Sequence, residues 1–159
     1  QYIKHPKDIT DQHVEIVIQK YTSGKQKFNG NSYFGITDLL KFVGKSTDKN
    51  SKMIELNSHT GENTFFFGCS SLFTNIYTVD SYSGEDKFNI ENNMSWEDIK
   101  VAYSSNTCHF DNISHFQNSI ADIVKNFKDI SFIYINNRGT LDIKKTIEII
   151  SLKKLLVNK

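Results

Sequence analysis

The sequence has few of the residues that mark linkers, disulfide scaffolds and metal sites. Pro6 is its only proline and Arg138 its only arginine, and its two cysteines, Cys69 and Cys108, lack CxxC or other metal-ligand spacing. With no proline-rich linker and no internal repeat, 159 residues are most simply one domain with a real core. The cysteines predict reduced thiols in a cytoplasm-like compartment, with a stray disulfide as the alternative.

The sequence also lacks long apolar runs and an excess of charge. No run approaches the ~18 apolar residues of a membrane span, and no signal-peptide pattern is present. The formal net charge of +1 gives no indication of a nucleic-acid groove or of binding to an anionic membrane. Because the chain begins at Gln1 rather than at methionine, it is compatible with a fragment of a longer protein.

Two regions differ in their patterning. Residues 1–34 are polar and read as an N-terminal helix and loop extension, in which the periodic stretch 11–21 forms a helix or a strand, the helix being favoured. Residues 35–159 read as an α/β domain. It opens with a helix over 36–44, where apolar residues recur at helical spacing and Gly44 stands at a C-cap position.

From residue 52 onward, short apolar strands alternate with helical patterns. Strands are predicted at 53–56, 76–80, 112–116 and 130–135, and helices at 62–72, from 95, at 119–127 and at 141–152. Residues 81–94 read as a polar loop, and Ser95 and Asp98 form a capping pattern for the helix that follows. Residues 155–157 continue the last helix or begin another strand. This alternation predicts parallel βαβ units with right-handed crossovers.

The stretch IELNSHTGENTFFF, residues 54–67, combines a buried strand, a turn of small residues and the start of a helix. Ligands of open α/β sheets bind beyond the carboxyl ends of strands, and Asp80 ends the next strand 25 residues after Glu55. A carboxylate there suits the two hydroxyls of a ribose; the alternative is a solvated acid that begins a turn. Asn57 stands where a glycine is expected. Asparagine can keep the turn, because it also enters the left-handed region at modest cost.

The run MIELNSHTGENTFFF…NIYTVDSYSG…KFN resembles the N-terminal half of class I S-adenosylmethionine-dependent methyltransferases of the small-molecule or sugar type. The later run DISFIYINNRGTLDIKKTIEII is similar to that family's fourth strand and following helix, so the resemblance covers roughly residues 35–157. It implies a Rossmann-like three-layer sandwich with a mainly parallel sheet in strand order 3-2-1-4. The C-terminal strands of the full fold would be lacking, which leaves the strand at 130–135 as an apolar edge.

The resemblance also implies roles for individual residues. Contacts to the cofactor S-adenosylmethionine are expected from Glu55, Asn57, Ser58, Gly61, Asp80, Ser81, Asn118 and Ser119. Asn136 and Arg138 would face the transferred methyl group and the acceptor, and His59 is a candidate general base. The alternatives are an exposed loop charge for Arg138 and a structural role for His59. No metal is expected, because Asn136 replaces an aspartate with a weaker ligand for a hard cation.

The function implied is methyl transfer from S-adenosylmethionine to a small-molecule or sugar acceptor, which Arg138 would anchor if it is anionic. The alternative is a catalytically inactive binding or assembly module with the same fold. A third class, another nucleotide-binding enzyme, is weaker, because neither GxxxxGK[ST] nor GxGxxG occurs. No nucleic-acid or membrane partner is expected. An oligomer, or the remaining part of a longer chain, would cover the edge strand.

Overall fold

A four-stranded parallel sheet lies at the centre of the computed structural model, which describes residues 36–48, 50–136 and 143–152. Its strands are β1 (Lys52–Leu56), β2 (Asn75–Val79), β3 (Ile113–Phe116) and β4 (Phe132–Ile135), in the order β3-β2-β1-β4. The helices are α2 (Ile36–Gly44), α3 (Glu62–Ser70), α4 (Lys87–Glu91), α5 (Trp96–Thr107), α6 (Ile120–Ile123), the 3₁₀ turn η1 (Val124–Asn126) and α7 (Ile143–Leu152). The α/β class and the strand order 3-2-1-4 are therefore confirmed.

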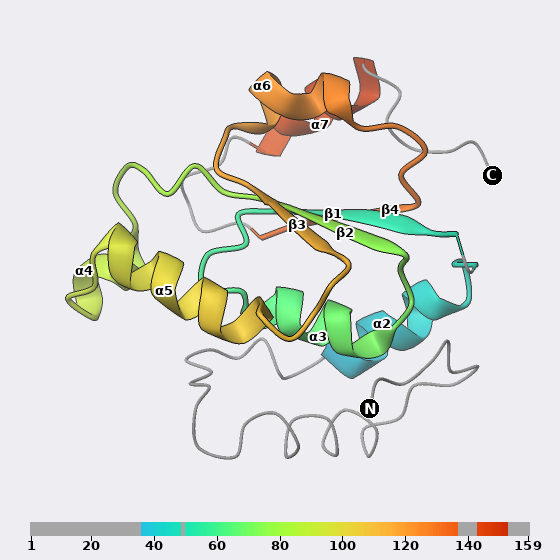
Figure 1. The fold of residues 1–159 in the computed structure, drawn as a ribbon. Coiled ribbons are helices and arrows are strands. Elements are labelled where there is room, and N and C mark those ends of the chain that lie inside the picture. Colours follow the sequence, from blue (N-terminus) through green and yellow to red (C-terminus); the bar gives the residue numbers. More distant parts are fainter. Residues whose placement is uncertain (1–35, 49, 137–142, 153–159) are drawn as a thin grey trace.

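Helices cover both faces of the sheet and make three layers (Figure 1). Helices α2, α3 and α5 lie on one face, and α6 and α7 lie on the other, while α4 stands at the end of α5. Among the described helices, none is both long and apolar enough to cross a membrane.

The central strand β1 is buried on both faces, and only its first residue, Lys52, is partly exposed. Met53 belongs to the core under α2 and α3, whereas Ile54 and Leu56 belong to the core under α6 and α7. Successive side chains of a strand point to opposite faces, so Glu55 points with Met53 toward α3. An acidic side chain thus lies in the middle of the sheet.

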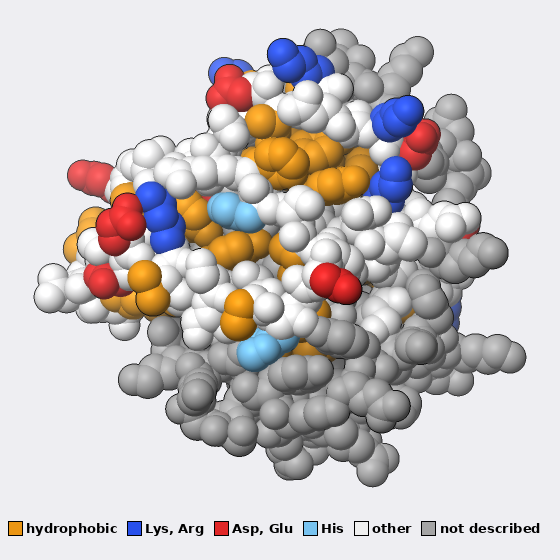
Figure 2. Space-filling view, viewed as in Figure 1, with side chains coloured by type: hydrophobic (Ala, Val, Ile, Leu, Met, Phe, Trp, Pro, Cys, Tyr) orange, Lys and Arg blue, Asp and Glu red, His pale blue; other side chains and the backbone are white. Residues whose placement is uncertain are grey.

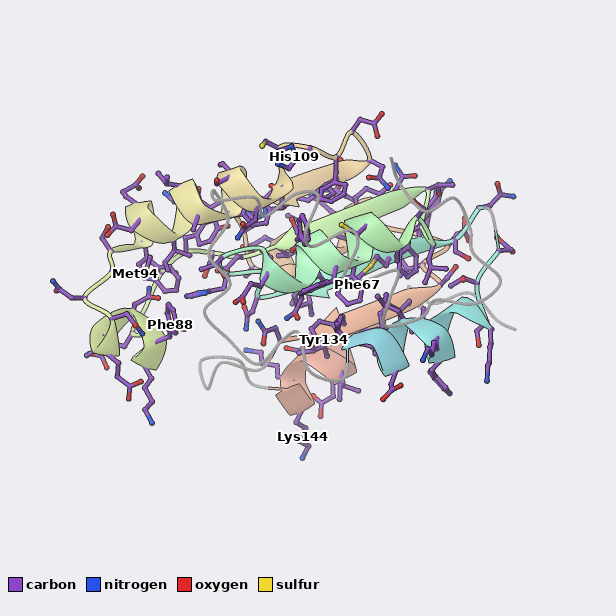
Figure 3. All side chains as sticks on the ribbon, turned by 90° about the horizontal axis from the view of Figure 1, so that it is seen from below. Phe67, Phe88, Met94, His109, Tyr134 and Lys144 are labelled. Atoms are coloured by element: carbon purple, nitrogen blue, oxygen red, sulfur yellow. The ribbon has the colours of Figure 1, made fainter. Side chains whose placement is uncertain are left out.

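The Phe65-Phe66-Phe67 run of α3 is core. All three rings are at most 2% exposed, and Phe67 packs edge-on against Tyr134 of β4 at 5.2 Å (Figure 3). Edge-to-face aromatic pairs of this kind add to the free energy gained by burial alone. They fix the helix that follows the β1 turn, and with it the turn.

The main difference from the sequence prediction lies between β2 and α5, where the expected loop contains helix α4. Asp86 caps this helix by accepting a hydrogen bond from the Asn89 backbone N–H at 3.1 Å. Of its five residues only Asn89 is buried, so no apolar periodicity signals the helix. The capping box of Ser95 and Asp98 on α5 is confirmed.

The other elements agree with prediction apart from their ends. The helix expected at 119–127 is a shorter α6 continued by η1. The extension 1–34, with its stretch 11–21, and residues 155–157 lie outside the described part of the chain.

Gly68 tests how closely α3 packs. A Cβ at this position would lie 2.8 Å from two carbons of the Phe110 ring, which itself packs on Phe65. We expect Gly68→Ala to lower the free energy of unfolding by about 1–3 kcal/mol, because the added methyl group overpacks the core. Urea denaturation measures the change.

Gly44→Ala is the matched control, since its Cβ would meet Leu72 at an ordinary 3.5 Å. It should be neutral or mildly stabilising through helix propensity. Equal effects of the two alanines would contradict the packing described here.

Candidate functional site

A cavity of about 470 Å³ opens at the carboxyl ends of β1, β2 and β3. Its volume lies in the range of small-ligand sites. It is lined by Leu56, Asn57, Val79, Asp80, Ser81, Ser83, Gly84, Glu85, Asn118, Ser119 and Ile120. Five of the residues predicted to contact a cofactor are brought together there: Asn57, Asp80, Ser81, Asn118 and Ser119. Figure 2 shows the face of the molecule seen in Figure 1, with hydrophobic side chains gathered beneath α6.

Asp80 is fixed in this cavity by two backbone hydrogen bonds. Its Oδ2 accepts from the His59 N–H at 2.9 Å and its Oδ1 from the Tyr82 N–H at 2.9 Å. The residue is 6% exposed. Because a carboxylate offers about four lone-pair sites, each oxygen keeps capacity for one further donor.

Asn57 adopts the left-handed conformation expected of a glycine substitute, with φ of 60°. Its Nδ2 donates to the Asn136 carbonyl at 3.2 Å, and the Asn136 Nδ2 donates back to the Asn57 carbonyl at 3.1 Å. This reciprocal amide pair joins the ends of β1 and β4. The Asn57 side chain is therefore directed toward β4, and the cavity beside it remains open over β1 and β2.

His59 lies 2% exposed and is not among the residues that line the cavity. Its Nε2 is 2.8 Å from Asn89 Oδ1 and 3.8 Å from Asp86 Oδ1, and its ring packs edge-on against Phe88 and Trp96. The predicted general base thus faces helix α4 and the start of α5.

Gly61 and Ser58 belong to the turn between β1 and α3. Gly61 is the N-cap of α3 at φ 75°, and a Cβ there would meet the Tyr103 ring at 3.0 Å, so both conformation and space favour glycine. Ser58 is buried beside Tyr82, and its hydroxyl lowers the pKa of that phenol against the larger effect of burial, which raises it. Arg138 lies outside the described residues.

Glu55 is wholly buried. Its Oε2 accepts from the Thr64 hydroxyl of α3, while Oε1 has no hydrogen-bond partner among the described residues. Loss of hydration raises the pKa of Glu55 to about 8, which the Thr64 hydrogen bond opposes and the negative charge of Asp80 reinforces. Glu55 is therefore a structural acid below the turn and does not line the cavity.

A polar cluster that the sequence did not predict lies on the same face of the sheet. The Thr78 hydroxyl is 2.5 Å from the Tyr103 hydroxyl and 2.8 Å from His115 Nδ1, and the rings of Tyr103 and His115 lie 4.4 Å apart. Burial lowers the pKa of His115, with a smaller opposing effect from Asp80. His115 is thus an imidazole packed against Tyr103 and held by Thr78.

Sequence reasoning missed the wall of the cavity formed by Ser83, Gly84 and Glu85. Ser83 and Gly84 end the run NIYTVDSYSG and Glu85 follows it, but no role was predicted for any of the three. Three apolar residues of the lining were recognisable from their positions beside the site. Leu56 and Val79 end their strands, and Ile120 begins α6.

Metal ligands and disulfides do not feature in the described residues. No group of three or more His, Cys, Asp or Glu side chains there is placed to hold a metal ion. Cys69 is buried and Cys108 exposed, and both are free thiols; burial raises the pKa of Cys69.

Comparison with known proteins gives a fold relationship. No protein-family model matches the chain, and no curated protein matches it. A solved structure described as precorrin 8W decarboxylase, from Methanobacterium thermoautotrophicum, is similar with a TM-score of 0.55 and 15% sequence identity over 78% of this chain. The match spans 59% of that protein's length. At this identity the similarity shows the fold alone.

This comparison corrects the prediction of function. The similar protein is a decarboxylase by description, a different activity from S-adenosylmethionine-dependent methyl transfer to a small molecule or sugar. The assignments methyltransferase and transferase are therefore withdrawn, and the alternative of an inactive module gains no support.

The buried acid Glu55 makes stability depend on pH. Its pKa is 4.5 in the unfolded chain and about 8 in the native state. Between these values the unfolded chain has lost a proton that the native state keeps, so rising pH favours unfolding by about 1.4 kcal/mol per pH unit. We expect Glu55→Gln to remove this contribution, so that the variant gains stability relative to wild type from pH 5 to pH 8.

Urea denaturation across this range measures the difference between the two proteins. Glu97→Gln is the control, because this glutamate is exposed and pairs only at the surface with Lys100. A constant difference between wild type and Glu55→Gln at every pH would show that Glu55 is ionised in the native state.

Proposed function

We propose that the cavity at the ends of β1, β2 and β3 binds a small molecule that carries a ribose, held by its two neighbouring hydroxyls on Asp80. The resemblance in sequence supports S-adenosylmethionine as a ligand of this type. The proposal concerns binding and assigns no methyl transfer.

The observation that carries the proposal is the orientation of the Asp80 carboxylate and its spare capacity to accept hydrogen bonds. Two backbone N–H groups orient it, and it lines the cavity with acceptor capacity to spare. Vicinal hydroxyls supply two donors at the spacing of the two carboxylate oxygens. Such charge-assisted hydrogen bonds are stronger than bonds between neutral groups.

The rest of the lining supports a nucleoside over a purely polar ligand. Leu56, Val79 and Ile120 supply apolar surface for a flat base, while Ser81 and Asn118 supply side-chain hydrogen-bonding groups. This mixture of apolar wall and few polar groups is common to cofactor sites. The site also lies at the carboxyl edge of the sheet, where open α/β folds bind ligands.

The cellular setting is proposed from the cysteines. The free thiols Cys69 and Cys108 support a reducing, cytoplasm-like compartment. The similar protein's description as a decarboxylase is not carried over, because 15% identity supports no residue-level correspondence.

Adenosine, S-adenosylmethionine and 2′,3′-dideoxyadenosine test the proposal by isothermal titration calorimetry. We expect saturable binding of the first two ligands and a loss of about 10- to 100-fold in affinity for the dideoxy compound, because two hydrogen bonds to a charged group disappear. No saturable heat, or equal affinity for all three, would contradict ribose recognition.

Asp80→Asn should reduce adenosine affinity by a similar factor, with Asp111→Asn as the control on an exposed acid away from the cavity. Circular dichroism must accompany the Asp80 variant, since an amide leaves one of its two backbone donors without an acceptor.

A further inference from the structure

We propose that His59 is a positioning residue whose imidazole holds the 83–92 segment in place and so sets the wall of the cavity. The inference rests on the proposed function for its effect on ligand binding. The contact itself is tested without any ligand.

The wall lies between two hollows of the surface. Gly84 and Glu85 line both the ligand cavity and a second, more open cavity of about 740 Å³ beside α4 and the start of α5. Ser83, Gly84 and Glu85 are exposed, and Gly84 has φ of 84° with nothing within 4 Å of its Cβ position. The position of this wall therefore depends on two side chains that anchor the 83–92 segment.

One anchor is Trp96, whose Nε1 donates to the Gly84 carbonyl at 3.0 Å. The other is His59, whose Nε2 lies 2.8 Å from Asn89 Oδ1 in α4. An amide oxygen only accepts, so this contact places a proton on Nε2. Phe88 and Trp96 enclose the imidazole at 5.3 and 5.9 Å, and Figure 3 shows Phe88 on α4 at the end of the molecule.

The same residue is tied to the ligand site through its backbone. The His59 N–H donates to Asp80 Oδ2, and its carbonyl accepts from the Tyr82 hydroxyl at 3.3 Å. His59 thus joins three parts: the β1 turn by its place in the chain, the end of β2 by its backbone, and α4 by its side chain. Loss of the side-chain contact frees the wall and leaves the Asp80 contact in place.

The variants separate these two roles. His59 has φ of 49°, a conformation that asparagine also tolerates, so His59→Asn keeps the backbone and shortens the side chain beyond reach of α4. Asn89→Ala removes the side-chain partner of His59 and keeps the backbone N–H that donates to the N-cap residue Asp86. Glu91→Gln, on the same helix with its side chain 59% exposed, is the matched control.

Trp96, the only tryptophan of the chain, reports the contact directly. We expect both variants to red-shift its fluorescence and to speed amide hydrogen exchange over residues 83–92, with the exchange of β1 and α3 unchanged. The double variant should show no larger change in emission or exchange than either single variant, because both substitutions remove the same interaction. Adenosine affinity should fall about tenfold, in line with a smaller binding-competent population.

Unchanged emission and exchange in His59→Asn and Asn89→Ala, or effects that add in the double variant, would overturn the positioning role. If wild type binds no adenosine, the proposed function fails, while emission and exchange still decide the role of His59. Normal adenosine affinity in variants whose wall has loosened would overturn the link between the wall and the ligand.

Discussion

The carboxylate of Asp80 is the interaction on which the arrangement of the site depends. It stands at the end of β2, and its two oxygens take backbone N–H groups from the β1 turn and from the start of the β2–α5 connection. Both donors belong to residues with positive φ, His59 at 49° and Tyr82 at 49°. Conformations of this kind are uncommon outside glycine, and the charged acceptor offsets their cost.

The buried layer between the sheet and helices α3 and α5 contains several polar side chains. Glu55 bonds to Thr64, and Thr78 joins Tyr103 and His115. Burying such groups costs free energy unless partners replace water, and the unpaired oxygen of Glu55 shows where this replacement is incomplete. The pKa of this acid is raised as a result, and Asp80 is the acid that lines the cavity.

Elements with strong local signals were predictable. The apolar strands, the phenylalanine run of α3 and the capping box of α5 follow from residue type and spacing alone. Helix α4 was missed because it is short, polar and held by its N-cap and by the His59 contact. The resemblance implied that Asp80, Ser81, Asn57, Asn118 and Ser119 contact one cofactor, and parallel strands bring such positions together because they end at one edge of the sheet. Their common cavity follows that rule.

The sequence by itself determined the α/β class, the order of strands and helices, and which strand ends carry polar residues, because hydrophobic periodicity and capping are local. Only the tertiary structure decided what those polar residues do. Asn57 pairs with Asn136, His59 turns to α4, and Glu55 is buried rather than facing a ligand. These outcomes depend on contacts between residues up to 79 positions apart. No local pattern records which of several polar neighbours a side chain will reach once the sheet has formed.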